Sequence, residues 1–249
     1  MTRVILFLNT QVGLEVAKFL ILDKKTCIDS VFLSNQYQEI DDKIRDFFLD
    51  TNTEVCDINN LEKIIYSKKN IDYLICVYWP YLLKKEVINQ SSNTINFHPA
   101  YLPINRGWYP HVHSIIDGSP AGVTLHEINE NADEGDIIVQ KKIHIPQNFC
   151  AGEAYKLLQN KILTLFKENW ELIKSGKIVK TKQKHSFSNY HKKNEIKKLD
   201  FIDIKLKENR DLINQLRARS FGEKGFAYFI DDDGDKVFMN LKLSKKKYP

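Results

Sequence analysis

The chain has 249 residues, of which 43% are hydrophobic and 28% are charged, and its formal net charge is +5. This length and balance are typical of one sizeable globular domain with room for a small appendage, and they exclude long disordered stretches. No apolar run approaches the roughly 20 residues that a membrane-spanning helix needs, and the opening run 4–8 is too short for a secretory signal, so we expect a cytoplasmic protein.

Apolar runs alternate with helix-like segments through the first hundred residues. Within 11–25, for example, Val12, Val16 and Leu20 recur at helical spacing. We predict strands at 4–8, 28–33, 53–58, 72–79 and 93–98, and helices at 11–25, 38–50, 61–70 and 82–90. This order predicts an α/β fold, Rossmann-like, with a mostly parallel sheet covered by helices on both faces.

The pattern changes after residue 98, where prolines and a glycine in 98–110 predict a structured loop. We predict a short helix at 111–118, strands at 121–128 and 136–146 joined by a polar turn at 129–135, a long helix at 152–176, a helix at 210–220, and a β-hairpin at 225–243. A Lys-rich connector near residue 180 divides the chain. We therefore expect a core domain at 1–180, and a connector with a small C-terminal helix and β-hairpin at 181–249.

Asn96 and His98 stand two residues apart at the end of a predicted strand. Alternate residues of a strand face the same side, so both side chains point one way and Phe97 points into the opposite packing layer. Pro99 ends the strand. Because ligands of parallel sheets bind at the carboxyl ends of the strands, the pair occupies a plausible site, although a polar rim that only caps the sheet is the alternative.

An amide and an imidazole suit acyl transfer to an amine. The amide can donate to a developing oxyanion, and the imidazole can move a proton near neutral pH. The imidazole needs a carboxylate partner, and the polar turn region offers four candidates: Glu130, Asp133, Glu134 and Asp136. No serine or cysteine nucleophile is evident, which favours direct transfer.

The remaining histidines and the cysteines give no metal pattern. His111 and His113 lie two apart in a predicted helix and face different directions, and His126 is expected to be a packed core residue. His185 and His191 fall in the connector. The four cysteines are far apart in the sequence, so we expect free thiols in a reducing compartment and no metal site.

Two stretches, "INFHPAYLPINRG" and "GVTLHEINENADEGDIIVQ", together resemble the core signature of the formyltransferases that use N10-formyltetrahydrofolate. The resemblance implies that Asn96, His98 and Asp133 are catalytic, with Asp133 chosen among the four carboxylates by its place in the motif. It also implies folate contacts in the loop after the fourth strand and in the polar turn: Trp79, Tyr81, Leu82 and Asn131.

Within that family, the chain is most similar to the nucleotide-sugar N-formyltransferases. This implies formyl transfer to an amino sugar, with dTDP-4-amino-4,6-dideoxyglucose as the expected acceptor, for surface glycans such as O-antigen. A 3-amino isomer or a GDP-linked sugar stays open. The alternatives are an enzyme resembling methionyl-tRNA formyltransferase, for which the C-terminal part is short, and a folate- or nucleotide-binding protein without activity.

Polar and aromatic residues near the expected site are candidates for holding the nucleotide sugar. A diphosphate needs cationic or hydroxyl donors. The candidates are Asn9, Thr10, Arg106, Tyr109, Tyr190 and Lys192. The exposed edge of the C-terminal hairpin could pair across a two-fold axis, so we also expect a homodimer.

Overall fold

A computed structural model describes residues 1–184, 186, 188–203 and 209–246. His185 lies outside this described part. The chain forms two compact units: unit 1 comprises Met1–His98, Thr124–Gln140 and Ile162–Gln183, and unit 2 comprises Pro99–Val123, Lys141–Lys161 and Lys184–Pro249. The segment from Lys184 onward therefore shares unit 2 with two earlier segments. The division into a core domain at 1–180 and a C-terminal part at 181–249 stays a prediction.

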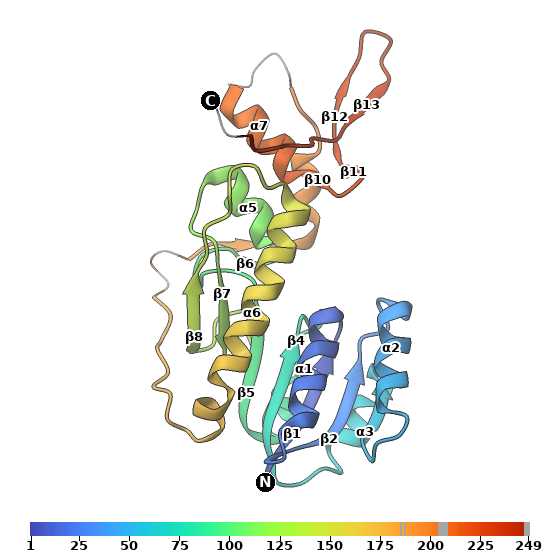
Figure 1. Ribbon diagram of the computed structural model, residues 1–249, viewed down its shortest axis with the longest axis vertical. Helices are drawn as coiled ribbons and strands as arrows, with labels where there is room; N and C mark the ends of the chain where they lie inside the picture. The colour runs from blue at the N-terminus through green and yellow to red at the C-terminus, as the bar shows by residue number, and fades with distance from the viewer. Residues whose placement is uncertain (185, 187, 204–208, 247–249) are drawn as a thin grey trace. The chain divides into compact units, whose positions relative to one another are not determined.

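A seven-stranded sheet forms the framework of the fold (Figure 1). Its strands are β1 (Thr2–Leu8), β2 (Thr26–Leu33), β3 (Glu54–Asp57), β4 (Ile71–Val77), β5 (Ser91–His98), β7 (Gly122–His126) and β8 (Ile137–Lys142). The order is β3-β2-β1-β4-β5-β7-β8; β1 to β5 pair in parallel, and β7 runs antiparallel to β5. The predicted mostly parallel α/β sheet is confirmed.

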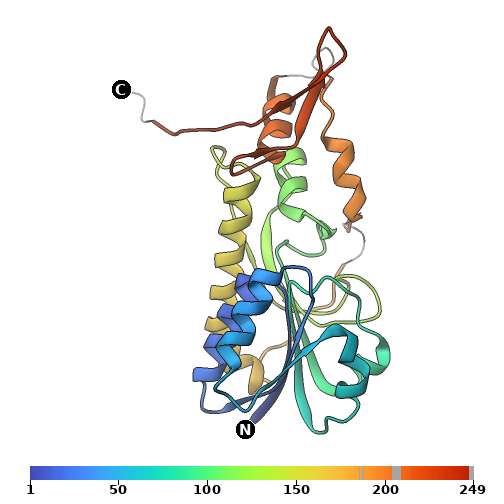
Figure 2. The same cartoon turned by 90° about the vertical axis from the view of Figure 1, so that its right-hand side faces the viewer.

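Helices cover both faces of the sheet in unit 1. They are α1 (Gln11–Leu22), α2 (Gln38–Phe48), α3 (Leu61–Ile65), α4 (Lys85–Ile88) and the second half of α6 (Ala151–Lys174). Figure 2 shows α1, α2 and α6 on one face and the short helices of 61–88 on the other. Phe7 and Phe32 stack between neighbouring strands with their ring centroids 5.2 Å apart, and both are fully buried. The continuous apolar runs of these strands follow from this two-sided burial.

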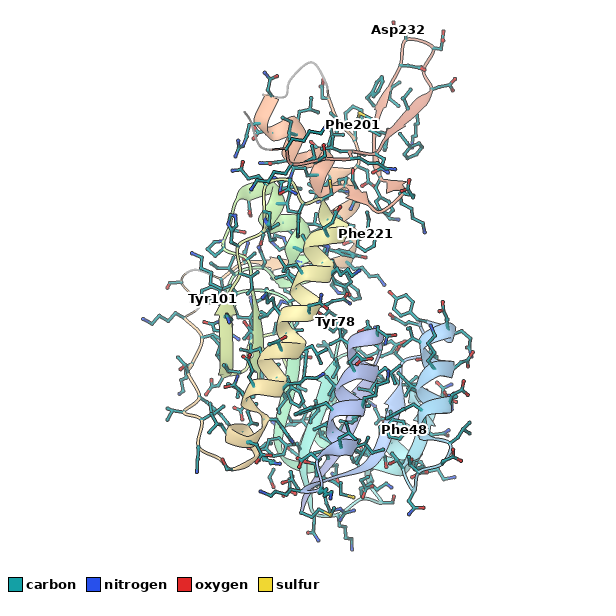
Figure 3. All side chains as sticks on the ribbon, in the orientation of Figure 1. Phe48, Tyr78, Tyr101, Phe201, Phe221 and Asp232 are labelled. Atoms are coloured by element: carbon teal, nitrogen blue, oxygen red, sulfur yellow. The ribbon has the colours of Figure 1, made fainter. Side chains whose placement is uncertain are left out.

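Unit 2 gathers short elements around a small apolar core. Its helices are α5 (Pro110–Asp117), the 3₁₀ helix η3 (Lys193–Leu199) and α7 (Asn209–Ala218), and its strands are β6 (Arg106–Gly107), β9 (Tyr190–His191), β10 (Ser220–Phe221), β11 (Lys224–Gly225), β12 (Ala227–Ile230) and β13 (Lys236–Met239). The predicted hairpin is β12–β13, with Asp232 at its tip (Figure 3). Val112, Ile115 and Ala218 are buried members of the core.

No helix in the described part of the chain is both long and apolar enough to cross a membrane.

Two stacked imidazoles lie inside unit 2. The rings of His113 and His191 are 3.4 Å apart and nearly parallel, at 7°. The Nε2 of His191 lies 3.0 Å from Oδ1 of Asn105, whose amide in turn donates to Ser114 and Ser119. This network joins the loop before α5 to β9.

Buried histidines in unit 2 should make stability depend on pH. Burial, with His113 and Arg219 nearby, lowers the pKa of His111 to about 3, and burial with His191 nearby lowers that of His113 to about 4. In an unfolded chain, these histidine side chains titrate at about pH 6.5. Below about this pH, the unfolded chain therefore binds more protons than the folded chain. The stability of the fold is complete above about pH 6.5 and is lost as the pH falls.

We therefore expect the Tm to drop by several degrees between about pH 7 and about pH 5. His113→Gln should flatten this slope, measured by thermal melts across the range. A Tm that is constant or rises on acidification would contradict the assignment.

Candidate active site

Asn96 and His98 close the carboxyl end of β5. In the antiparallel register with β7, Asn96 pairs with His126 and His98 pairs with Thr124. Phe97, between them, is 2% exposed and packs against Phe166 with the ring centroids 5.0 Å apart. The predicted division of the strand, with two polar side chains on one face and an aromatic ring on the other, is confirmed.

Asp133 reaches this strand end from the polar turn. Its Oδ1 accepts a hydrogen bond from Nδ2 of Asn96 at 3.2 Å, and its Oδ2 lies 3.5 Å from Nδ1 of His98. The His98 and Asp133 side chains are only 6% and 13% exposed. The structure thus brings together the amide, the imidazole and one of the four candidate carboxylates. Glu130, by contrast, points toward Lys85, with the two side chains largely exposed.

His126 completes this cluster, although from the sequence it was expected only to be a packed core residue. Its Nε2 lies 3.0 Å from Nδ2 of Asn96 and 3.4 Å from Oδ1 of Asp133. Its Nδ1 lies 2.6 Å from the carbonyl oxygen of Glu127, an acceptor, so Nδ1 carries a proton. His126 is buried as expected, but it faces the polar cluster and not only the core. The pairing of β7 with β5 puts His126 opposite Asn96, and no local sequence pattern indicates that register.

The turn that carries Asp133 is shaped by tight backbone contacts. Asp133 has a φ of +56°, in the left-handed region, where Asp is tolerated better than most residues. A Cβ on Gly135 would lie 1.9 Å from the carbonyl oxygen of Glu127, so only glycine fits. The N–H of Glu127 donates to the carbonyl of Asp136 at 2.9 Å. These contacts hold the carboxylate against the end of β5.

The loop after β4 carries the predicted folate contacts. The Trp79 ring packs edge-on against Phe7 and Tyr81, at 5.2 and 5.5 Å between centroids, and its buried indole N–H has no partner among the described residues. The Tyr81 hydroxyl donates to the carbonyl of Ser34, while Leu82 is 70% exposed. Asn131 is exposed in the polar turn. The Trp79 N–H could donate to a polar atom of a flat heteroaromatic ligand, and the exposed Leu82 side chain could pack against its ring.

The predicted substrate contacts in unit 1 lie at the end of β1. Asn9 is 5% exposed; its amide donates to the carbonyl of Tyr78 and accepts from the Ser34 hydroxyl. Thr10 stands at the start of α1, and its buried hydroxyl has no partner in the described part of the chain. The Asn9 side chain therefore links the ends of neighbouring strands, whereas the Thr10 hydroxyl can still donate to a ligand.

The other predicted substrate contacts all belong to unit 2. The Arg106 guanidinium lies over the Tyr190 ring at 5.8 Å, because β6 and β9 pair in parallel there. Tyr109 precedes α5 with a φ of +56°, and the N–H of Lys192 donates to Glu195 at the start of η3. The structure thus brings Arg106 and Tyr190 together. Their roles toward a substrate stay predictions.

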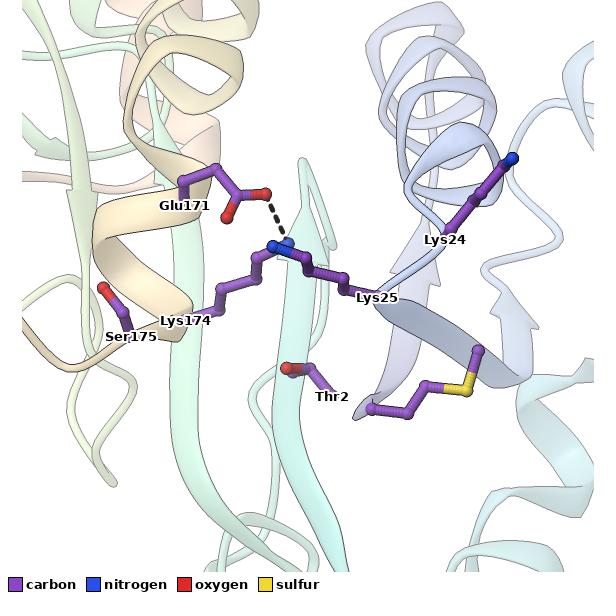
Figure 4. Close-up of a pocket in the computed structure, with 7 residues that line it drawn as sticks. Thr2, Lys24, Lys25, Glu171, Lys174 and Ser175 are labelled. Atoms are coloured by element: carbon purple, nitrogen blue, oxygen red, sulfur yellow. Dashed lines mark ion pairs between the residues drawn. The ribbon is translucent and has the colours of Figure 1, made fainter.

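A separate hollow lies at the opposite, amino end of β1 (Figure 4). It is lined by Met1, Thr2, Lys24, Lys25, Glu171, Lys174 and Ser175. Its buried charge, Lys174, is already paired with Asp23 and Glu171 at 2.5 Å each. None of the predicted site residues line it, so it is distinct from the cluster at the end of β5.

Comparison with known proteins gives the family. Residues 52–168 match the formyl transferase family, and residues 195–245 match the C-terminal dimerization domain of N-formyltransferases. The segment 52–168 therefore belongs to the formyl transferase family. The resemblance noted from the motifs is therefore confirmed.

Individual formyltransferases match over different lengths. The dTDP-4-amino-4,6-dideoxyglucose formyltransferase of Mycobacterium tuberculosis is 34% identical over 154 residues, which are 61% of this chain and 65% of that protein. A 4-N formyltransferase from Francisella tularensis shares 27% identity and a TM-score of 0.86, over 98% of this chain and 99% of that one. A formyltransferase from Anoxybacillus kamchatkensis, in complex with UDP-4,6-dideoxy-4-formamido-L-AltNAc and tetrahydrofolate, shares 28% identity and a TM-score of 0.55, over 77% and 98%.

In the described part of the chain, no group of three or more His, Cys, Asp or Glu side chains is arranged to hold a metal ion.

Proposed function

We propose that the protein transfers a formyl group from N10-formyltetrahydrofolate to the amino group of a nucleotide-linked amino sugar, with dTDP-4-amino-4,6-dideoxyglucose as the acceptor. The observation that carries this proposal is the cluster of Asn96, His98 and Asp133 at the end of β5. The named activity of the M. tuberculosis relative and the tetrahydrofolate bound to the A. kamchatkensis relative support the choice of acceptor and donor.

N10-formyltetrahydrofolate supplies an activated formyl carbon. In the ligand-free structure, Nδ2 of Asn96 donates its two hydrogens to Asp133 and His126. In our proposal, one of these two bonds is exchanged for a hydrogen bond to the formyl oxygen as negative charge develops on it. The acceptor amine attacks the carbon, and His98 removes the proton that the amine loses. The new C–N bond forms, the bond from carbon to N10 breaks, and N10 takes up a proton as tetrahydrofolate leaves.

Asp133 orients His98 and stabilises its charged form. Nδ1 of His98 faces the Asp133 carboxylate. Our proposal assigns the proton transfer from the amine to the other ring nitrogen, Nε2. The 3.5 Å separation is longer than a strong hydrogen bond, and contacts of this kind tighten when substrate binds. His126 accepts from Asn96 and so holds the amide in place.

The test uses the purified protein, N10-formyltetrahydrofolate and a panel of nucleotide amino sugars. The panel holds 4-amino and 3-amino sugars linked to dTDP, GDP and UDP, with methionyl-tRNA in a parallel reaction. Mass spectrometry should show formyl addition to the dTDP-linked 4-amino sugar ahead of the others. Formylation of methionyl-tRNA alone, or folate binding without any product, would replace the proposal by one of the two alternatives.

We further propose that the protein acts as a homodimer through its C-terminal segment. Residues 195–245 match a dimerization domain. Four phenylalanines of that segment are also 39–62% exposed: Phe201, Phe221, Phe226 and Phe238. Sedimentation should give a dimer for the wild type, and Phe238→Lys should shift it toward the monomer. A single species of 29.1 kDa for the wild type would contradict this proposal.

We also propose a cytoplasmic location and a role in making surface glycans such as O-antigen. The four cysteines are free, and three of them are buried, which suits a reducing compartment.

A further inference from the structure

Gln183 reaches the catalytic turn from the far end of unit 1. Its Nε2 donates to the carbonyl of Asp133 at 2.9 Å and to the carbonyl of Gly135 at 2.7 Å. The residue is only 8% exposed. It lies outside both segments that match the family, 52–168 and 195–245.

The backbone near Gln183 fixes where its side chain goes. Thr181 and Ile137 exchange two hydrogen bonds of 2.8 Å, which pins the connector antiparallel to the start of β8. Lys180 adds an ion pair with Glu127 on the same stretch. Gln183 comes two residues after this bridge, so its amide is held in register with the turn that precedes β8.

The two carbonyls that Gln183 binds belong to the part of the turn that sets the Asp133 side chain. Asp133 has a left-handed backbone, which costs free energy unless its surroundings hold it. Both amide hydrogens of one nitrogen are used on these carbonyls, one on each side of Glu134. A side chain bound in this way resists a peptide flip or a shift of the turn.

We propose that Gln183 is a positioning residue, which keeps the Asp133 carboxylate in reach of His98 and Asn96 by clamping the carbonyls of Asp133 and Gly135. This inference rests on the proposed function for its kinetic consequence. Without the clamp, the carboxylate moves relative to His98, and misplacement by about 1 Å can cost about 100-fold in rate.

The chain offers a matched control in Gln215. Its Nε2 also donates to two carbonyls, those of Leu199 and Phe201, at 2.9 Å each, and it is 6% exposed. It lies in unit 2. Gln183→Met and Gln215→Met therefore remove the same pair of hydrogen bonds from equally buried sites, and only the first touches the catalytic turn.

The experiment compares both variants with the wild type by thermal melts and steady-state kinetics. Both should lose a similar amount of Tm. Gln183→Met should lower kcat by about 10- to 100-fold with KM for the nucleotide sugar nearly unchanged, while Gln215→Met keeps kcat. Unchanged kcat in Gln183→Met, or an equal fall in Gln215→Met, would overturn the proposal.

Two further measurements keep the test decisive. If Gln183→Met does not fold, Gln183→Asn takes its place. It retains an amide donor on a shorter side chain, and its kcat should fall below that of Gln215→Met. If the wild type formylates no acceptor, the proposed function fails by itself. The imidazole NMR signals of His98 in the ligand-free protein then decide: they should move in Gln183→Met and stay fixed in Gln215→Met, and the reverse would refute the clamp.

Discussion

His98→Asn should lower kcat by about 10³-fold while the protein stays folded. The variant keeps a polar side chain at the end of β5 but removes the group that takes up the proton of the acceptor amine, and general base catalysis is worth about 10²–10⁴ in rate. The packing of β5 depends on Phe97 on the other face, which the substitution leaves alone. Steady-state kinetics and a thermal melt of the same preparation measure both effects.

An exposed histidine provides the control for this variant. His144 is exposed and belongs to neither the cluster nor the predicted contacts, so His144→Asn should keep full activity. Near-normal turnover of His98→Asn would remove His98 from the mechanism.

Asp133→Asn should have the second largest effect, a loss of kcat/KM of at least about 10²-fold. The substitution removes the negative charge beside His98 and places N–H groups or a neutral oxygen there. Asn accepts the left-handed backbone of this position as well as Asp does, so the turn should survive. The loss of activity would then be caused by the missing carboxylate and not by misfolding.

Glu130→Gln is the matched variant for this experiment. It removes a carboxylate from the same polar segment, three residues earlier, where the side chain is largely exposed and pairs only loosely with Lys85. Its activity should equal that of the wild type. If the two variants lost activity equally, the choice of Asp133 among the carboxylates would be wrong.

The sheet and the first half of the site could be predicted because their causes are local. Apolar runs of strand length gave the order of elements, and alternation along one strand put Asn96 and His98 on the same face. Asp133 could be chosen among four carboxylates only through the motif. In the structure its position follows from contacts across many residues, such as the approach of Gly135 to Glu127.

His126 and Gln183 could not be predicted in the same way. His126 enters the cluster through antiparallel pairing of β7 with β5, a register that no local pattern specifies. Gln183 reaches the turn across about fifty residues of sequence, from a Lys-rich connector whose composition gave no sign of such a contact. Contacts that depend on the tertiary fold are thus the part of the site that sequence patterns leave out.

Transfer of a labelled formyl carbon tests the central claim most directly. N10-formyltetrahydrofolate with ¹³C in the formyl group is incubated with the protein and dTDP-4-amino-4,6-dideoxyglucose, and the label is followed by NMR. We predict that the label appears as a formamide on the sugar nitrogen with the wild type and not with His98→Asn. Label that stays on the folate, or appears as free formate while the sugar remains unmodified, would contradict the account.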